Sequence, residues 1–262
     1  MKLPIYQVDA FANQVFEGNP AAICPLNQWL PDELMQTIAL ENNLSETAFF
    51  VPQEEGYHIR WFTPASEVDL CGHATLASAF TLFNHLGYKK DQIQFFSKSG
   101  LLTVCRDGQW LEMDFPAQPP LVYNAPDKLL AAFTQKPKTC LKATDYILVF
   151  EHEEQVKQAS PDLHALSSLD LRGVCITAQA QHYDMVCRFF APKHGINEDP
   201  VTGSAFTQLV PYWAEVLGKT LINARQVSAR GGDVRCQLIG DRVKIAGKAI
   251  LYMEGILDLP DH

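Results

Sequence analysis

The sequence lacks the features that mark several classes of protein. Its 262 residues contain no run of lysines or arginines, and the formal net charge is −9, which together argue against a nucleic-acid-binding surface. No stretch approaches the roughly 18 uninterrupted apolar residues that a transmembrane helix requires. The N-terminal segment also lacks the apolar core of a signal peptide. We therefore expect neither a nucleic-acid partner nor a membrane span.

The chain also lacks a disulfide or metal pattern among its cysteines. The seven cysteines are scattered, odd in number and contain no C-x-x-C pair. In a chain of this size the pattern indicates reduced thiols that serve mostly as small core residues, so we expect a soluble, cytoplasmic protein. With 47% hydrophobic and 19% charged residues, the chain can bury a substantial core in one large domain or two smaller ones.

The sequence does contain one duplicated motif. Arg-x-Phe-x-Pro occurs at Arg60 and again at Arg188, 128 residues later. A glycine followed by an apolar helical stretch and a final Leu-Gly occurs from Gly72 and again from Gly203, 131 residues later. A duplicated strand–turn–helix unit, spaced by half the chain, predicts two similar lobes that face each other across a cleft.

The duplication also predicts the domain organisation and the fold class. Three prolines between residues 116 and 120 indicate a linker, so we expect an N-terminal lobe over residues 1–116 and a C-terminal lobe over 117–262, with the last strand able to pair back onto the first lobe. Many short strands surround the two helical stretches. We therefore expect an α+β fold of two pseudo-symmetric lobes, each a mostly antiparallel sheet rolled around a central helix.

The helices themselves show contrasting patterns. The stretch from Gly72 to Leu86 is apolar on nearly all sides, which is typical of a helix buried all round. An earlier helix should begin after Trp29, with Leu34, Ile38 and Leu40 as its buried stripe. Pro211 falls inside the second central helix, where it should kink the helix or interrupt its hydrogen bonds.

Both central helices begin at a glycine followed by a small polar group. Free backbone N–H groups and the helix dipole at Gly72 and Gly203 favour an anion such as a substrate carboxylate. The structural alternative is that these glycines only allow close packing of strand and helix. His73 and Ser204 follow the two glycines, and Asp199 lies shortly before the second; capping or charge complementation of the helix would also explain these three.

Glu46 is the strongest acid/base candidate. It lies between the end of a helix and an entirely apolar strand, where a carboxylate is expected to be partly desolvated and able both to take and to give a proton. An exposed glutamate in a turn is the alternative.

Cys71 is a further candidate, because a cysteine beside a helix N-terminus is expected to have a lowered pKa and to act as a thiolate base. The equivalent position in the second copy is Pro200 or Thr202, depending on alignment, and neither is a thiol. A racemase with one thiol on each face of its substrate would therefore lack half of its machinery.

With these residues in view, the chain resembles the PhzF family of phenazine-biosynthesis-like isomerases, which shares the diaminopimelate epimerase fold. The matching pieces stand in family order from the first strand to the second central helix. They are Asp9-Ala10-Phe11, Gly18-Asn19-Pro20, Leu44-Ser45-Glu46-Thr47, Phe62-Thr63-Pro64, Gly72-His73-Ala74-Thr75, Glu198-Asp199-Pro200-Val201-Thr202-Gly203-Ser204-Ala205 and Pro211-Tyr212-Trp213. Two features depart from the pattern: the thiol of Cys71, and the stretch 230–235, which fits only loosely.

The resemblance implies a reaction and a set of site residues. It implies an isomerase that moves a proton within a small, anionic, cyclic or unsaturated acid, with no metal and no organic cofactor, and it implies a homodimer. Glu46 would be the catalytic carboxylate, helped by His73 and Asp199. Substrate contacts would come from Asn19, Ser45, Gly72, Thr202, Gly203 and Ser204.

Two other functions remain open at this point. The first is a cofactor-independent amino-acid racemase or epimerase that uses Cys71 with Glu46 or Asp199 as bases on opposite faces of the substrate. The second is a non-catalytic protein that keeps the fold to bind a small ligand. The presence of Glu46 argues against the second, since ligand binding alone does not require an acid/base carboxylate.

Overall fold

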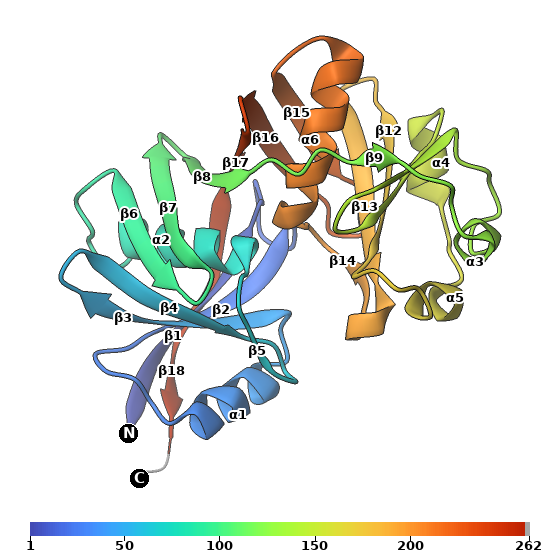
Figure 1. Ribbon diagram of the computed structural model, residues 1–262. Coiled ribbons are helices and arrows are strands. Elements are labelled where there is room, and N and C mark those ends of the chain that lie inside the picture. The colour runs from blue at the N-terminus through green and yellow to red at the C-terminus, as the bar shows by residue number, and fades with distance from the viewer. Residues whose placement is uncertain (260–262) are drawn as a thin grey trace. The chain divides into compact units, whose positions relative to one another are not determined.

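The computed structural model describes residues 1–259, which fall into two compact units. The first unit comprises Met1–Asp114 and the segment that begins at Ala246, and the second comprises Phe115–Ile245. In Figure 1 the blue to green part of the ribbon and the C-terminal strand β18 belong to the first unit, while the part between them, from green through orange to dark red, belongs to the second. The first unit is thus built from both ends of the chain.

The first unit is dominated by strands and contains two helices. The helices are α1 (Asp32–Asn42) and α2 (Gly72–Asn84). The strands are β1 (Lys2–Ala10), β2 (Asn19–Pro25), β3 (Glu46–Gln53), β4 (Gly56–Phe62), β5 (Glu67–Val68), β6 (Gln92–Ser97), β7 (Gly100–Asp107), most of β8 (Trp110–Pro116) and β18 (Ala249–Asp258).

The second unit has a similar strand content and more short helices. The helices are α3 (Asp127–Ala131), α4 (Glu153–Gln158), α5 (Leu163–Ser167), the 3-10 turn η1 (Pro192–His194) and α6 (Gly203–Leu217). The strands are β9 (Leu121–Val122), β10 (Thr139–Lys142), β11 (Tyr146–Val149), β12 (Val174–Gln179), β13 (Met185–Ala191), β14 (Ile196–Asp199), β15 (Leu221–Gln226), β16 (Gly232–Ile239) and most of β17 (Arg242–Gly247).

The two units repeat one order of strand pairings. In the first, β2–β3 is parallel, β3–β4 antiparallel, β4–β6 parallel and β6–β7 antiparallel. In the second, β11–β12 is parallel, β12–β13 antiparallel, β13–β15 parallel and β15–β16 antiparallel. In both units the chain between the second pair of parallel strands contains a long helix. This helix is α2 between β4 and β6, and α6 between β13 and β15. The duplication seen in the sequence is therefore a duplication of topology.

Helix α2 is the buried centre of the first unit. It packs on β1, β2, β3 and β18, and ten of its thirteen residues are buried, as its apolar sequence predicts. Its three buried hydroxyl groups would be costly without partners, but each donates to the carbonyl four residues earlier. These bonds are Thr75 Oγ1 to Cys71 O at 2.6 Å, Ser78 Oγ to Ala74 O at 2.8 Å and Thr81 Oγ1 to Ala77 O at 2.9 Å.

Helix α1 forms where expected, but it buries a different stripe from the predicted one. Leu40 is 59% exposed, whereas Met35, Ile38 and Ala39 are buried. The spacing of three and four residues in this set is the spacing of one helix face, and Leu40 lies away from that face. The prediction for Leu40 was therefore wrong.

Helix α6 is the counterpart of α2 in the second unit, and it packs on β15 and β16. Pro211 lies inside it as predicted. Proline has no N–H to offer the carbonyl of Thr207 four residues earlier, and that carbonyl instead accepts from the backbone N–H of Gln118 at 2.9 Å. None of the helices in the described part of the chain is long and apolar enough to cross a membrane.

Candidate active site

Glu46 is the first residue of β3, where that strand begins its parallel pairing with Ala21 of β2. Its side chain is 13% exposed, and Oε2 lies 3.1 Å from Nε2 of His73. Both atoms are buried, and neither has an aligned hydrogen-bond partner. A carboxylate oxygen and an imidazole nitrogen are thus held together in a place with little water.

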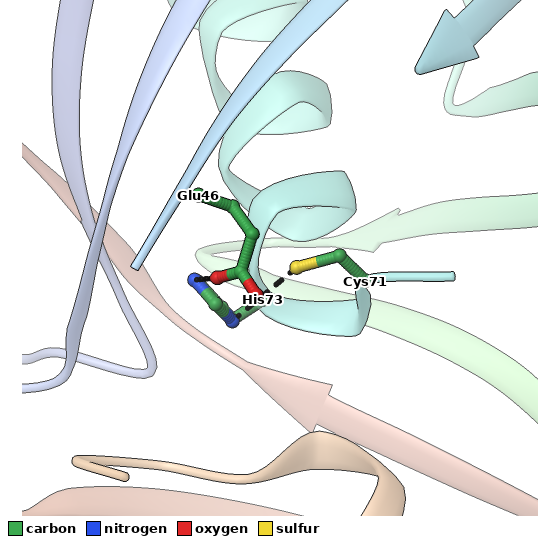
Figure 2. A group of neighbouring side chains, drawn as sticks. All are labelled: Glu46, Cys71 and His73. Carbon is green, nitrogen blue, oxygen red and sulfur yellow. Dashed lines mark hydrogen bonds and ion pairs between the residues drawn. The ribbon is translucent and has the colours of Figure 1, made fainter. Parts of the chain in front are cut away.

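Cys71 and His73 lie at the start of helix α2 and complete this group. Cys71 is the N-cap residue, and its Sγ is 3.5 Å from Nδ1 of His73. Figure 2 shows the three side chains converging, with Glu46 coming from the start of β3 and the other two from the first turn of the helix. The structure therefore brings together two of the predicted catalytic residues, Glu46 and His73, with Cys71, the candidate base of the racemase alternative.

Charge and burial act in opposite directions on this group. Burial by itself lowers the pKa of His73, but its electrostatic interactions and hydrogen bonds with Cys71 and Glu46 outweigh that effect, and the pKa is raised well above its ordinary value. For Cys71, burial raises the pKa and the charge of Glu46 adds to that, against a smaller lowering by His73. The expected lowering of the Cys71 pKa was therefore wrong, because burial outweighs the helix terminus. The group combines a carboxyl group with an imidazole and a thiol whose pKa values are both raised.

Gly72 begins α2 between these two side chains. A Cβ atom built at this residue would meet only Cε of Met113, at 3.9 Å, which is ordinary van der Waals contact. Close packing of strand and helix therefore does not explain this glycine. The helix start also has no side-chain cap hydrogen bond.

Asn19 and Ser45 lie one strand away from the catalytic candidates. Asn19 is fully buried at the start of β2, and Ser45 directly precedes Glu46. The Ser45 hydroxyl donates to Oδ1 of Asn19 at 3.4 Å. The structure thus places both predicted substrate-binding residues in the first unit and in contact with each other, with Ser45 directly before Glu46 and Asn19 two residues before Ala21, the strand partner of Glu46.

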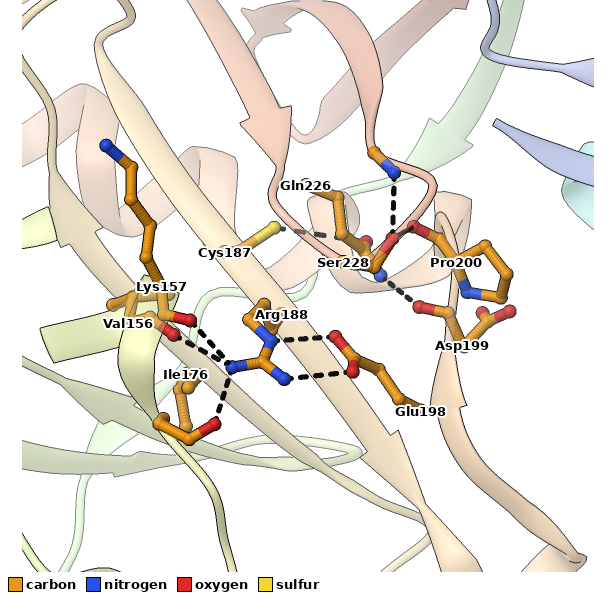
Figure 3. Close-up of polar contacts among 12 residues, drawn as sticks. Val156, Lys157, Ile176, Cys187, Arg188, Glu198, Asp199, Pro200, Gln226 and Ser228 are labelled. Carbon is orange, nitrogen blue, oxygen red and sulfur yellow. Dashed lines mark hydrogen bonds and ion pairs between the residues drawn. The ribbon is translucent and has the colours of Figure 1, made fainter. Parts of the chain in front are cut away.

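In the second unit, Asp199 and Thr202 form the turn between β14 and α6. The Thr202 hydroxyl donates to Oδ2 of Asp199 at 2.6 Å. Gln226, fully buried on β15, donates from Nε2 to the Asp199 carbonyl at 2.6 Å and accepts the Thr202 N–H at Oε1 at 2.9 Å. Figure 3 shows Gln226 and Ser228 on one side of this turn, with Ser228 donating to the Pro200 carbonyl at 2.8 Å. The turn that leads into α6 is therefore fixed by side chains.

Ser204, at the second position of α6, is held by an arginine. Nη1 of Arg172 donates to Ser204 Oγ at 3.0 Å, while Nε donates to Oδ1 of Asp145 at 2.9 Å and Nη2 pairs with Oδ2. Asp145 is fully buried and also accepts from Nε2 of Gln208 at 2.6 Å. Because Arg172 donates to Oγ, the Ser204 proton is left to point elsewhere. Gly203 begins the helix beside this network.

Sequence reasoning missed the residues that position these groups. Arg172, Asp145 and Gln226 lie 24 to 63 residues from the groups they hold, outside any motif. The one available signal in the sequence was a glutamine or aspartate next to apolar strand residues. That signal does not reveal which group the side chain binds. Among residues 1–259, Glu46, Cys71 and His73 are the one group of three His, Cys, Asp or Glu donors close enough to hold a metal ion.

The fold and this group of side chains define a class, and comparison with known proteins identifies it. A family model described as phenazine biosynthesis-like protein, PhzC-PhzF, matches residues 8–255. A curated relative, an uncharacterized isomerase of Pseudomonas aeruginosa, is 52% identical over 99% of this chain and 100% of its own. The crystal structure of a PhzF-family phenazine biosynthesis protein from Enterococcus faecalis has a TM-score of 0.97, 46% identity and coverage of 99% of this chain and 100% of that one.

These matches extend to the epimerase class at the level of fold. A hydroxyproline epimerase from Agrobacterium vitis, solved with trans-4-hydroxy-L-proline, has a TM-score of 0.64 at 10% identity and covers 99% of this chain and 93% of that one. The protein therefore has the two-lobed, epimerase-like α+β fold that was predicted. The chain belongs to the phenazine biosynthesis-like PhzC-PhzF family, as the resemblance of its motifs indicated.

Proposed function

We propose that this protein is a cofactor-independent isomerase that moves a proton within a small cyclic or unsaturated acid, with Glu46 as general acid and base. The observation that carries the proposal is the buried Oε2 of Glu46, which lies 3.1 Å from His73 without an aligned hydrogen bond. A buried carboxylate oxygen that has one ion-pair contact and no well-aligned hydrogen bond is costly, and a catalytic role explains why it is kept. The family and the isomerase names of its relatives support the reaction class.

The proposed reaction uses one carboxylate twice. Glu46 removes a proton from one substrate carbon, the electron pair moves into the unsaturated system, and the same carboxyl group returns the proton to a second carbon on the same face. His73 lies against Glu46 and fixes its orientation, and its charge stabilises negative charge that develops on the substrate. A single base suits a proton shift, whereas inversion at one carbon needs groups on both faces.

We propose that the substrate is an anion, because each unit taken by itself has a helix start that favours such a group. In the first unit this start has the N–H groups that follow Gly72, with Asn19 and Ser45 close by. In the second unit Asp199, Thr202 and Gly203 shape the start of α6, and Ser204 offers a hydroxyl proton because Arg172 occupies its oxygen. A carboxylate is the group that such helix starts favour. On the basis of the family resemblance, we also propose that the protein acts as a homodimer.

The racemase alternative is less well supported. Its base would be the Cys71 thiolate, but burial raises the pKa of that thiol. Its second base would be Glu46, which lies in the same group as Cys71, or Asp199, whose Oδ2 already accepts the Thr202 hydroxyl at 2.6 Å. Cys71 is therefore proposed as a neutral neighbour of His73.

The decisive experiment follows solvent hydrogen. A panel of cyclic and unsaturated carboxylic acids is incubated with the protein in D2O and monitored by NMR for deuterium incorporation and for a shifted double bond. Glu46→Gln keeps the size of the side chain but removes the base, so we expect the rate to fall by about 10²–10⁴-fold. Glu54→Gln, an exposed glutamate at the end of the same strand region, is the matched control and should retain the wild-type rate.

Three outcomes would contradict the proposal. Undiminished turnover in Glu46→Gln would remove this carboxylate from the mechanism, and loss of turnover in Cys71→Ala with retention in Glu46→Gln would favour the racemase. Binding of acids without turnover of any of them would favour a ligand-binding protein.

A further inference from the structure

The three side chains in Figure 2 combine three different kinds of metal donor in one buried place. One thiol, one imidazole and one carboxylate each offer an atom, and the three atoms all lie within 4.8 Å of one another. The His73 side chain is 8% exposed, and its Nε2 has no aligned hydrogen-bond partner; the same holds for the buried Oε2 of Glu46. Nε2 of His73 faces Oε2 of Glu46 at 3.1 Å and Nδ1 faces Sγ of Cys71 at 3.5 Å, so the imidazole lies between the two other metal donors.

The spacing of these atoms suits a tetrahedral cation. Zinc bonds of about 2.3 Å to sulfur and about 2.0–2.1 Å to nitrogen place the two ligand atoms about 3.5 Å apart at a tetrahedral angle. Sγ of Cys71 and Nδ1 of His73 are 3.5 Å apart. Glu46 begins a strand and the other two begin a helix, so the backbone of all three is fixed. Rotation of the Glu46 side chain would bring its carboxylate to the ion as the third ligand.

We infer that Glu46, Cys71 and His73 form a binding site for a thiophilic divalent cation, for which Zn²⁺ is the fitting ion. Mg²⁺ and Ca²⁺ prefer oxygen ligands throughout, so a site with one sulfur and one nitrogen selects against them. A carboxylate and a thiolate together carry two negative charges, which neutralise a divalent ion. Binding releases the protons of the Cys71 thiol and the His73 imidazolium to solvent, and no oxidant or reductant is required.

Occupation of this site would block the proposed reaction. The ion would bind the carboxylate oxygen that the reaction uses and the imidazole beside it. It would therefore act as an inhibitor that competes for the catalytic groups, and not as a cofactor. The metal site does not depend on the proposed reaction, because binding can be measured without any substrate.

The test uses Co²⁺ as a spectroscopic substitute for Zn²⁺. The purified full-length protein, kept reduced, is titrated with CoCl₂. We expect visible d–d bands of tetrahedral cobalt and a sulfur-to-cobalt charge-transfer band, which saturate at one ion per chain and disappear when Zn²⁺ is added. Equimolar Mg²⁺ should leave the spectrum unchanged.

Variants identify the ligands. Cys71→Ser should abolish the charge-transfer band, and His73→Gln and Glu46→Gln should each weaken Co²⁺ binding by at least about 10–100-fold. Cys105→Ser is the control. All seven cysteines lie in the described part of the chain, and Cys105 is the one among them that is not buried. This variant should bind Co²⁺ as the wild type does. Circular dichroism without metal checks that each variant is folded, and the two non-cysteine variants carry the test if Cys71→Ser does not fold.

Two results would overturn the inference. The first is the absence of a sulfur-to-cobalt band in the folded wild-type protein. The second is a band that survives Cys71→Ser or is lost in Cys105→Ser, since the metal would then be bound by another thiol. If the site binds metal but Glu46→Gln keeps its isomerase activity, the metal site stands and the proposed function fails.

Discussion

Arg60 and Arg188 do the same structural task at equivalent points of the two units. Nε and Nη2 of Arg60 donate to the two carboxylate oxygens of Glu67 at 2.8 and 2.9 Å, and those of Arg188 donate to Glu198 at 2.7 and 2.9 Å. Each guanidinium also lies over the phenylalanine two positions later, at 5.1 and 5.0 Å from the ring centre. Fork-shaped pairing and stacking together are specific to arginine, which explains why the duplicated motif begins with this residue.

This pair predicts an acid-dependent loss of stability. Hydrogen bonds from Arg60, with help from Lys98, lower the pKa of Glu67 from 4.5 to about 2. Because the folded-state pKa is depressed, the stabilisation is complete above the unfolded value and disappears as the pH falls through the folded one. We expect Glu67→Gln to lose on the order of 1–3 kcal/mol of unfolding free energy near neutral pH, and the difference from wild type to vanish between about pH 5 and pH 2.

Urea denaturation at a series of pH values measures this effect. Glu41→Gln, which removes an exposed carboxylate from the same unit, is the control and should follow the wild-type curve within about 0.5 kcal/mol. A constant gap between Glu67→Gln and wild type at all pH values would mean that the variant loses packing and not a proton-linked interaction.

At the scale of elements, the interruption of α6 is repaired from outside the helix. Pro211 leaves the carbonyl of Thr207 without its helical donor, and the N–H of Gln118, in the proline-rich segment after β8, takes that place at 2.9 Å. The hydroxyl of Thr144 donates to Oε1 of Gln118 at 2.7 Å and holds that residue in turn. The predicted linker is thus tied to the second central helix by a main-chain hydrogen bond.

This compensation predicts a small effect for Pro211→Ala. A proline in a helix interior costs about 3 kcal/mol relative to alanine when nothing replaces its hydrogen bond. Because Gln118 already satisfies Thr207, we expect the free energy of unfolding to change by less than about 1 kcal/mol. In the wild type, the Gln118 amide should exchange slowly with D2O although it lies outside any strand. A gain near 3 kcal/mol together with fast exchange of Gln118 would contradict this account.

These elements show what the sequence reveals and what it hides. The ends of α6 could be read from Gly203 and Gly218, and α2 from its unbroken apolar run, because glycine and periodicity are local signals. Short elements such as α3, α5 and β14 were missed, since four or five residues carry no measurable period. The cluster around Glu46 was predicted only in part. Its proximity to His73 depends on the packing of β3 against α2, which sequence spacing does not contain.

At the scale of the whole molecule, the two ends of the chain meet within the first unit. Strand β18 pairs with β1 in an antiparallel ladder from Lys2–Asp258 to Ala10–Ala249, with one irregularity after Gln7. The amino group of Met1 donates to the Leu259 carbonyl at 2.6 Å. Figure 1 shows the red strand β18 beside the blue strand β1. The first unit therefore cannot be completed until the last strand has been made.

This topology predicts opposite results for two rearranged chains. A chain that stops after Gly247 lacks β18, so that β1 loses one of its two partners and α2 loses part of its cover. We expect it to unfold without cooperativity and to bind hydrophobic dyes. A circular permutant keeps every strand if a short linker joins the ends and the chain is opened in the exposed turn at Gly108, between β7 and β8. It should unfold cooperatively with a Tm within about 4 °C of wild type, which corresponds to about 1 kcal/mol.

A second permutant, opened between Met253 and Glu254, separates the effect of the new ends from that of the missing strand. It contains all residues but cuts the ladder between β1 and β18 at its middle, so it should be less stable than the permutant opened at Gly108. Thermal unfolding followed by circular dichroism compares the three chains. If the truncated chain melted cooperatively at the wild-type Tm, β18 would be dispensable, and the first unit would be closed by contacts within residues 1–114 alone.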